Sequence, residues 1–179
     1  LHTICSSGMC PNIHECWGNG TATFMILGDI CTRSCKFCAT TTGKPGTVDP
    51  NEPENLANSV KLMQLKHCVI TSVTRDDLPD EGAAHWAETI RKVKEVNPNT
   101  KVEVLIPDFN GSTQLIDIVL SANADIVAHN LETVKRLTPS VRSAAKYHRS
   151  LEVIKYISSQ GVLSKSGIML GLGENREEV

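Results

Sequence analysis

Six of the seven cysteines in this 179-residue chain lie within its first 38 residues, in two groups of three. The second group, called here the loop triad, follows the apolar run 24–27 with a C-x3-C-x2-C spacing and consists of Cys31, Cys35 and Cys38. Three thiolates this close can hold three irons of a 4Fe–4S cluster and leave the fourth iron open to another ligand. An open iron can bind a reactant, so this spacing indicates chemistry rather than electron transfer alone.

The first group, called here the N-terminal triad, has a C-x4-C-x5-C spacing and consists of Cys5, Cys10 and Cys16. An odd number of cysteines, most of them bunched, is a poor disulfide framework, and in a reducing compartment such bunching favours metal. A structural zinc site stays open as an alternative for the loop triad, because His14 or another side chain could complete a tetrahedral set. The lone Cys68 is expected to be a small buried side chain.

The composition is that of a globular chain, with 40% hydrophobic and 21% charged residues. A net charge of −2 and only 4% aromatic residues give no sign of a nucleic-acid surface, and no apolar run is long enough for a membrane helix. We therefore expect a cytoplasmic protein, or one of a mitochondrial or plastid matrix. The chain begins with Leu1 and stops where a helix would begin, so we expect an internal fragment of a longer polypeptide.

Short apolar runs alternate with helical patterns after the cysteine-rich start. The runs are rich in Val and Ile, as buried parallel strands are, and cover residues 23–27, 69–73, 102–106, 125–128 and 167–170. Stripes of helical period lie between them and begin at Leu56, Trp86, Leu115 and Leu151. Ser112 is a suitable N-cap for the third stripe, and Gly161 closes the fourth.

This alternation predicts an α/β fold with a parallel sheet and right-handed crossovers. A complete barrel of eight units needs about 250 residues, so residues 21–179 fit a partial (β/α) barrel, preceded by an N-terminal cysteine-rich extension over residues 1–20. Polar segments follow every strand, at residues 31–38, 71–77, 107–111, 129–132 and 171–174. Because parallel barrels place their sites at the carboxyl ends of the strands, these segments predict one site with the metal loop on its wall.

The loop triad, with the aromatic Phe37 before its last cysteine, resembles the signature of the radical S-adenosylmethionine (radical SAM) superfamily. Together with the N-terminal triad, the chain resembles the lipoyl synthase family over segments 11–17, 28–38, 70–78, 105–109, 129–134 and 165–174. It departs from that family in one respect. The family's auxiliary cluster takes a fourth ligand from a serine in an Arg-Ser-Ser-Tyr motif near the C-terminus, and this sequence has no such motif.

The resemblance implies a radical-SAM partial barrel with about five of its six units present, truncated at the C-terminus. It implies that a 4Fe–4S cluster on the loop triad cleaves S-adenosylmethionine, and that an auxiliary 4Fe–4S cluster on the N-terminal triad gives up its sulfur. The product would be a lipoyl group, made by inserting sulfur at carbons six and eight of a protein-bound octanoyl-lysine. Unactivated C–H bonds offer nothing to an acid–base pair, so radical chemistry suits this task.

The implied partners are the octanoylated carrier domain of 2-oxoacid dehydrogenases or of the glycine cleavage system, and an electron donor such as flavodoxin or ferredoxin. The segment from Gly167 to Gly171 resembles the strand that lies beside the adenine, although an ordinary strand and turn would read the same way. Asn130 and Glu132 would bind the ribose or the amino group, and Arg142 a carboxylate. Each of these could instead be an ordinary surface or helix-start residue.

Two further classes of function remain open at this point. One is a radical SAM enzyme with a single catalytic cluster, and the other is a non-catalytic metal-binding module. Arg75, Asp76 and Asp77 are expected to pair with one another and shape the rim, and His129 is the histidine placed there. Because the last strands and the serine ligand are missing, we expect this segment to bind clusters but to form little or no lipoyl product.

Overall fold

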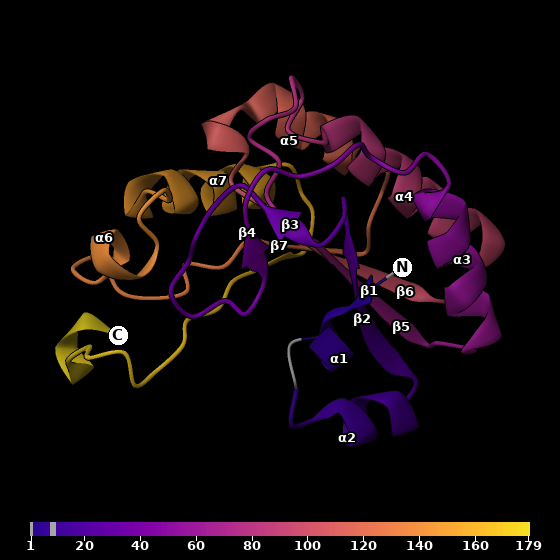
Figure 1. Ribbon diagram of the computed structural model, residues 1–179, viewed down its shortest axis with the longest axis horizontal. Coiled ribbons are helices and arrows are strands. Elements are labelled where there is room, and N and C mark those ends of the chain that lie inside the picture. Colours follow the sequence, from indigo (N-terminus) through magenta and orange to yellow (C-terminus); the bar gives the residue numbers. More distant parts are fainter. Residues whose placement is uncertain (1, 8–9) are drawn as a thin grey trace.

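The computed structural model describes residues 2–7 and 10–179, and Figure 1 shows a curved sheet with helices along its outer side. The main sheet has the strand order β1-β2-β5-β6-β7-β8. Its strands are β1 (His2–Thr3), β2 (Thr21–Ile26), β5 (His67–Ser72), β6 (Lys101–Leu105), β7 (Ile126–Ala128) and β8 (Ser164–Lys165). All neighbours are parallel except β1, which pairs antiparallel with β2. The predicted parallel α/β architecture is therefore present, as an open sheet in the described residues.

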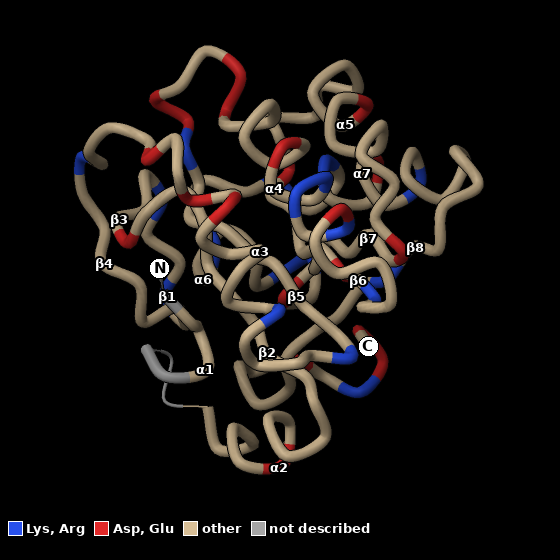
Figure 2. The backbone as a smooth tube through the Cα atoms, turned by 90° about the vertical axis from the view of Figure 1, so that its right-hand side faces the viewer, with Lys and Arg blue, Asp and Glu red and all other residues tan. Residues whose placement is uncertain are grey.

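The main crossover helices are α3 (Glu52–Leu62), α4 (Ala83–Val96), α5 (Thr113–Leu120) and α7 (Tyr147–Ser159). The smaller elements are α1 (Ile4–Ser7), α2 (Ile13–Gly18), β3 (Ile30–Cys31), β4 (Thr41–Thr42), η1 (Phe109–Gly111), α6 (Thr138–Val141) and η2 (Arg176–Glu178). Figure 2 shows acidic and basic residues interspersed along the chain rather than gathered by sign. Among the described residues, no helix has the length and apolarity needed to cross a bilayer.

The core lies between the sheet and the helices because strand side chains alternate between two faces. Phe24, Ile70 and Val104 are aligned on neighbouring strands and belong to the same buried cluster as Trp86 and Ile90 of α4. The opposite face carries the positions between them. This alternation leaves the concave side of the sheet and the carboxyl ends of its strands for the site.

The first four predicted strands are confirmed to within two residues, and the fifth is placed wrongly. The strand that pairs with β7 is β8, whereas the predicted segment 167–170 contributes an isolated bridge between Ile168 and Glu132. The chain then turns away through Gly171 and Gly173, whose φ angles are 97° and 104°. A two-residue polar edge strand has no apolar run, which is why the sequence did not reveal it.

The four predicted helices are confirmed, and the Ser112 side chain caps α5 by accepting from Leu115 N. The stripe predicted for α7 is right at Ile157 and one position too late at its start. Leu151 is 40% exposed, and the buried residues of this helix are Ser150, Val153 and Ile157. The polar Ser150 takes a core position because its hydroxyl has a buried partner, described below.

Candidate metal centre and nucleotide pocket

A strained turn carries the chain from β2 into the cysteine loop. Leu27 has a φ of 68°, in the left-handed region that non-glycine residues rarely adopt. Its N–H donates to Glu52 Oε2 at 2.8 Å, and its carbonyl accepts from Arg75 Nη1 at 3.2 Å. Its buried side chain packs on Gly82, where an added Cβ would lie 2.6 Å from Leu27 Cδ1. The turn is therefore fixed through its N–H, its carbonyl and its side chain.

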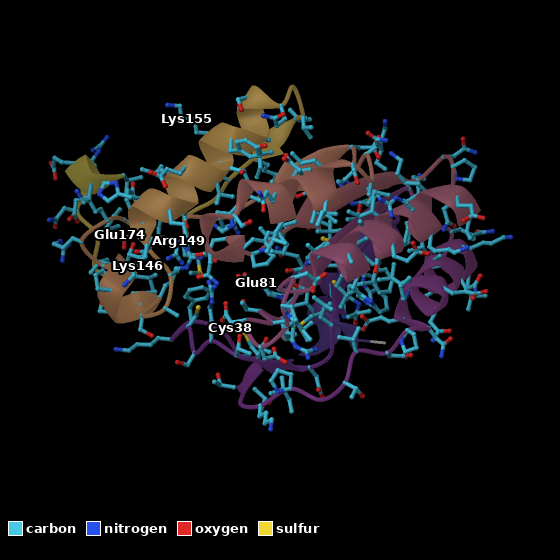
Figure 3. All side chains as sticks on the ribbon, turned by 90° about the horizontal axis from the view of Figure 1, so that it is seen from above. Cys38, Glu81, Lys146, Arg149, Lys155 and Glu174 are labelled. Atoms are coloured by element: carbon cyan, nitrogen blue, oxygen red, sulfur yellow. The ribbon has the colours of Figure 1, made fainter. Side chains whose placement is uncertain are left out.

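The loop triad lies just beyond this turn, at the carboxyl end of β2. Cys31 Sγ accepts the backbone N–H groups of Arg33 at 3.4 Å and Thr74 at 3.2 Å. Burial raises the pKa of the Cys35 thiol, the Arg142 guanidinium opposes this, and the neighbouring Cys38 and Cys31 thiols raise the pKa further. Because Cys38 and Cys31 act on the Cys35 thiol, the three side chains lie near one another. Figure 3 labels Cys38, the exposed member of the triad.

The donor set suits a cluster better than a single metal ion. No group of three His, Cys, Asp or Glu side chains in the described residues could hold one ion. Structural zinc requires such a convergent set of four ligands. A cubane instead binds each thiolate at a different iron, so its cysteines stand farther apart. All seven cysteines are free thiols, and two backbone N–H groups already point at Cys31 Sγ, which suits a thiolate ligand.

The N-terminal triad comes before β2 in the chain, and its first member packs beside the middle of that strand. Cys5 on α1 is buried, and its Sγ accepts Thr23 N at 3.4 Å. Cys10 N donates to Cys5 O at 3.1 Å, and Cys16 belongs to α2, which leads into β2. Figures 1 and 2 both show α2 on the side of the sheet away from β3 and β4. The division of the chain at residue 20 stays a prediction, although β1 joins the same sheet.

A polar cavity of about 130 Å³ opens beside the loop triad. It is lined by Cys35, Asn130, Glu132 and Arg142, so the structure brings these four predicted residues together. Ser72 Oγ and Arg142 Nε are buried there without a hydrogen-bond partner among the described residues. Buried polar atoms are nearly always satisfied, so these two atoms indicate that the cavity receives a ligand.

Arg142 and Glu132 give this cavity its charge. Arg142 Nη1 donates to the carbonyls of Asn130 at 3.1 Å and Leu131 at 3.0 Å, which leaves Nε for a ligand. Burial raises the pKa of Glu132, and Asn130 and Arg142 oppose the rise. Glu132 has a φ of 65°, and its backbone bonds to Gly167 O and Met169 N. A desolvated carboxylate of this kind gains from a cationic ligand group.

The remaining predicted contacts are less central. A Cβ at Gly167 would stand 3.3 Å from Asn130 Oδ1, so this glycine does permit a close approach. Gly171 has nothing within 4 Å of such a Cβ, and Phe37 is 37% exposed. The structure therefore does not bring Gly171 and Phe37 into the cavity wall, which contains neither.

His129 is a buried residue of the cavity wall, and both of its ring nitrogens have partners. Its Nδ1 lies 2.9 Å from Ile106 O and its Nε2 lies 2.9 Å from Ser150 Oγ. Burial lowers the pKa of His129, which favours the neutral ring with Nδ1–H donating and Nε2 accepting from Ser150. His129 therefore lies on the rim as expected, with both ring nitrogens satisfied by protein partners.

The sequence interpretation missed Arg33. Arg75 pairs with Asp77 at 2.9 Å as expected, whereas Asp76 pairs with Arg33 at 2.6 Å instead of with its chain neighbours. Arg33 also bonds to Asp108 at 2.8 Å. The available signal was a basic residue inside the metal loop, with acidic residues just after the next two strands.

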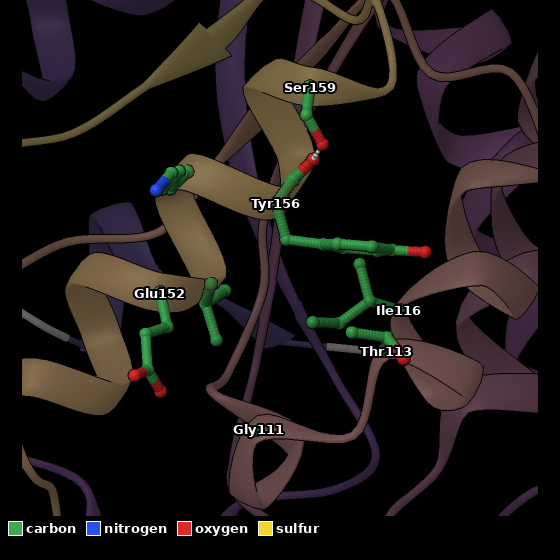
Figure 4. A pocket seen from close by; sticks show the side chains of 8 residues that line it. Gly111, Thr113, Ile116, Glu152, Tyr156 and Ser159 are labelled. Atoms are coloured by element: carbon green, nitrogen blue, oxygen red, sulfur yellow. Dashed lines mark hydrogen bonds between the residues drawn. The ribbon is translucent and has the colours of Figure 1, made fainter.

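A second cavity, of about 350 Å³, lies between α5 and α7 and is lined by residues that include Gly111, Ile116 and Tyr156. Figure 4 shows it, with the Ser159 hydroxyl donating to the Tyr156 carbonyl at 2.7 Å. None of the predicted site residues lines it. Although this cavity is larger than the one beside the loop triad, it lacks the residues expected to carry the chemistry.

Comparisons with known proteins give relatives for the whole chain. The family model described as the radical SAM superfamily matches residues 25–179. A lipoyl synthase of Bacteroides fragilis is 66% identical over all 179 residues, which span 62% of that protein. A mitochondrial lipoyl synthase of Nematostella vectensis is 61% identical over 180 aligned residues, again 62% of its length.

Solved structures share the fold at low sequence identity. Methylornithine synthase matches with a TM-score of 0.68 at 17% identity, over 92% of this chain and 49% of that one. A radical S-adenosylmethionine methyltransferase of Kitasatospora setae matches with a TM-score of 0.62 at 14% identity, over 93% of this chain and 34% of that one. Both likenesses concern the fold alone.

Proposed function

Because the chain belongs to the radical SAM superfamily, we propose that it forms the catalytic core of a lipoyl synthase. The observation that carries the proposal is the position of the loop triad at the carboxyl end of β2, beside a cavity lined by Asn130, Glu132 and Arg142. The identity of 66% to a lipoyl synthase supports this member of the superfamily over an enzyme with a single cluster. The activity is sulfur insertion at carbons six and eight of a carrier-bound octanoyl group.

The loop triad would hold three irons of a 4Fe–4S cluster, and its own surroundings prepare it for that task. The N–H groups of Arg33 and Thr74 stabilise negative charge on Cys31 Sγ. With S-adenosylmethionine, the cluster supplies the one-electron chemistry that yields a radical able to take hydrogen from an unactivated carbon. The half-buried Cys35 lines the cavity, so a nucleotide bound there would have its reacting end next to the triad.

The cavity residues would orient S-adenosylmethionine through its charged groups. The unpartnered Nε of Arg142 would donate to the carboxylate of the methionine moiety, with Nη1 held by two backbone carbonyls. Burial raises the pKa of Glu132, and an ammonium group beside it would favour its charged carboxylate form. Asn130 lies next to both and can bond to a ribose hydroxyl.

The N-terminal triad would hold a second 4Fe–4S cluster, which is the sulfur-donating substrate of the reaction. Cys5, Cys10 and Cys16 supply three ligands, and a serine from outside these 179 residues would supply the fourth, as in the family. The octanoyl group would arrive on a carrier domain of a 2-oxoacid dehydrogenase or of the glycine cleavage system. Flavodoxin or ferredoxin would supply electrons, and the cytoplasm is the proposed location, consistent with bacterial relatives.

The test is cleavage of S-adenosylmethionine by the anaerobically reconstituted chain with dithionite. The intact chain is expected to take up about eight irons, as two cubanes require, and to form 5′-deoxyadenosine. Cys35→Ala is expected to reduce that product to background, whereas the matched control Cys68→Ala, at a buried thiol outside both triads, leaves it unchanged. Product formation by Cys35→Ala at the rate of the intact chain would refute the proposal.

A further inference from the structure

Arg33 lies between the first two cysteines of the loop triad, and its side chain is only 8% exposed. Its Nε and Nη2 donate to Asp76 Oδ2 and Oδ1 at 2.9 and 2.6 Å, and its Nη1 donates to Asp108 Oδ1 at 2.8 Å. Asp76 follows β5 and Asp108 follows β6. One guanidinium therefore ties the metal loop to the ends of two neighbouring strands.

Asp108 extends this tie to α7. Its side chain is 0% exposed, and its second oxygen accepts Arg149 Nη1 of α7 at 3.3 Å. The next residue, Ser150, is bonded to His129, which directly precedes Asn130. Arg33 and Arg149 balance Asp76 and Asp108, so the cluster of four charges is neutral. The metal loop and α7 thus share the buried Asp108 carboxylate.

The same anchor bears on the Cys31 sulfur. The Arg33 N–H donates to Cys31 Sγ at 3.4 Å, and the Thr74 N–H donates to it at 3.2 Å. Thr32 Oγ1 lies 2.9 Å from Thr74 O and 2.8 Å from Asp76 Oδ2. Fixing the Arg33 side chain therefore fixes the loop backbone whose Arg33 N–H donates to Cys31 Sγ. Through Asp76 and Thr32 it also fixes the segment after β5 whose Thr74 N–H donates to the same sulfur.

We propose that Arg33 is a positioning residue for the cluster. Its ion pairs keep the loop triad in a binding geometry before iron arrives, and they maintain the two N–H···S bonds to Cys31. Such bonds stabilise the more negative, reduced form of an iron–sulfur cluster and raise its potential. The inference rests on the proposed function for the presence of a cluster, and the role of Arg33 in it is additional.

The test compares Arg33→Lys and Arg33→Gln with Arg91→Gln, an exposed arginine of α4 as the matched control. All are made in a chain carrying Cys10→Ala and Cys16→Ala, so that the loop triad alone binds iron. An ammonium group keeps the charge but cannot bridge two carboxylates as a planar guanidinium does. We expect Arg33→Lys to lose iron to a chelator at least about tenfold faster than its parent, the size typical of ligand-orienting residues.

The midpoint potential, followed by electron paramagnetic resonance, separates positioning from general stabilisation. Arg33→Lys is expected to shift it to a more negative value, and Arg91→Gln to leave it unchanged. If Arg33→Lys matches its parent in chelation rate, or changes only the unfolding temperature, the inference is overturned. Arg33→Lys decides alone if Arg33→Gln does not fold. A parent chain that binds no cluster would overturn the proposed function instead.

Discussion

Substitution of Gly82 by alanine tests whether the Leu27 turn is as tightly held as its contacts indicate. The φ of Gly82 is 85°, and a Cβ there would lie 2.6 Å from Leu27 Cδ1, too close for any real contact. The left-handed backbone costs a residue with a Cβ about 1–2 kcal/mol, and overpacking against a buried side chain adds about 1–3 kcal/mol. Leu27 is 2% exposed and cannot move aside freely. The unfolding free energy should therefore fall by about 2–5 kcal/mol.

Gly161→Ala is the matched control, because Gly161 has a φ of 74° but nothing within 4 Å of an added Cβ. It isolates the backbone cost of about 1–2 kcal/mol, so the difference between the two variants measures the contact with Leu27. Urea unfolding of both chains gives these free energies directly. Equal losses in the two variants would show that Leu27 has room to move, and the reasoning about a rigid entry to the cysteine loop would then be wrong.

Two further predictions concern the buried polar groups around the cavity. Asp108→Asn leaves Arg33 and Arg149 facing a neutral amide and should lower the unfolding free energy by about 3–5 kcal/mol; a loss below that of the exposed Asp117→Asn control would contradict it. Burial alone would raise the pKa of Asp108, but the combined lowering by Arg33 and Arg149 is larger. The pKa of Asp108 in the folded protein is therefore below the ordinary value. The stability it contributes is present above the unfolded pKa of about 3.9 and is lost as pH falls through the folded pKa, so acid unfolding of Asp108→Asn should be less steep in that window. Ser150→Ala removes the donor to His129 Nε2 and should cost about 1–3 kcal/mol in thermal or urea unfolding, whereas Ser159→Ala on the exposed end of the same helix should cost little; equal effects would refute the assignment.

The convergence of the site on one edge was predictable from the sequence, because parallel strands all end at that edge. Cys35 and Asn130 are far apart in the chain, and each follows an apolar strand, which was enough to place them together. Arg142 reaches the same cavity 12 residues after Asn130, past α6. The short β8 was not predictable in the same way. Its two polar residues pair with β7 at an edge, where burial does not demand an apolar run.

Side-chain pairing was the other part that the sequence did not determine. Asp76 has Arg75 beside it in the chain, yet its partner is Arg33, 43 residues earlier. Arg75 opens a turn in which it pairs with Asp77 instead, so proximity along the chain does not select the partner. The core position of Ser150 was hidden for a related reason, since its buried partner His129 lies on another element.

Strand β2 lies between the N-terminal triad and the loop triad along the chain. One group precedes it and the other follows it, and its six residues extend over about 17 Å. Adding or removing one residue there would change the separation by about 3.3 Å and turn every later side chain of the strand to the opposite face. The residue count of β2 thus sets where the loop triad begins relative to the rest of the sheet, and engineered variants should leave that count unchanged.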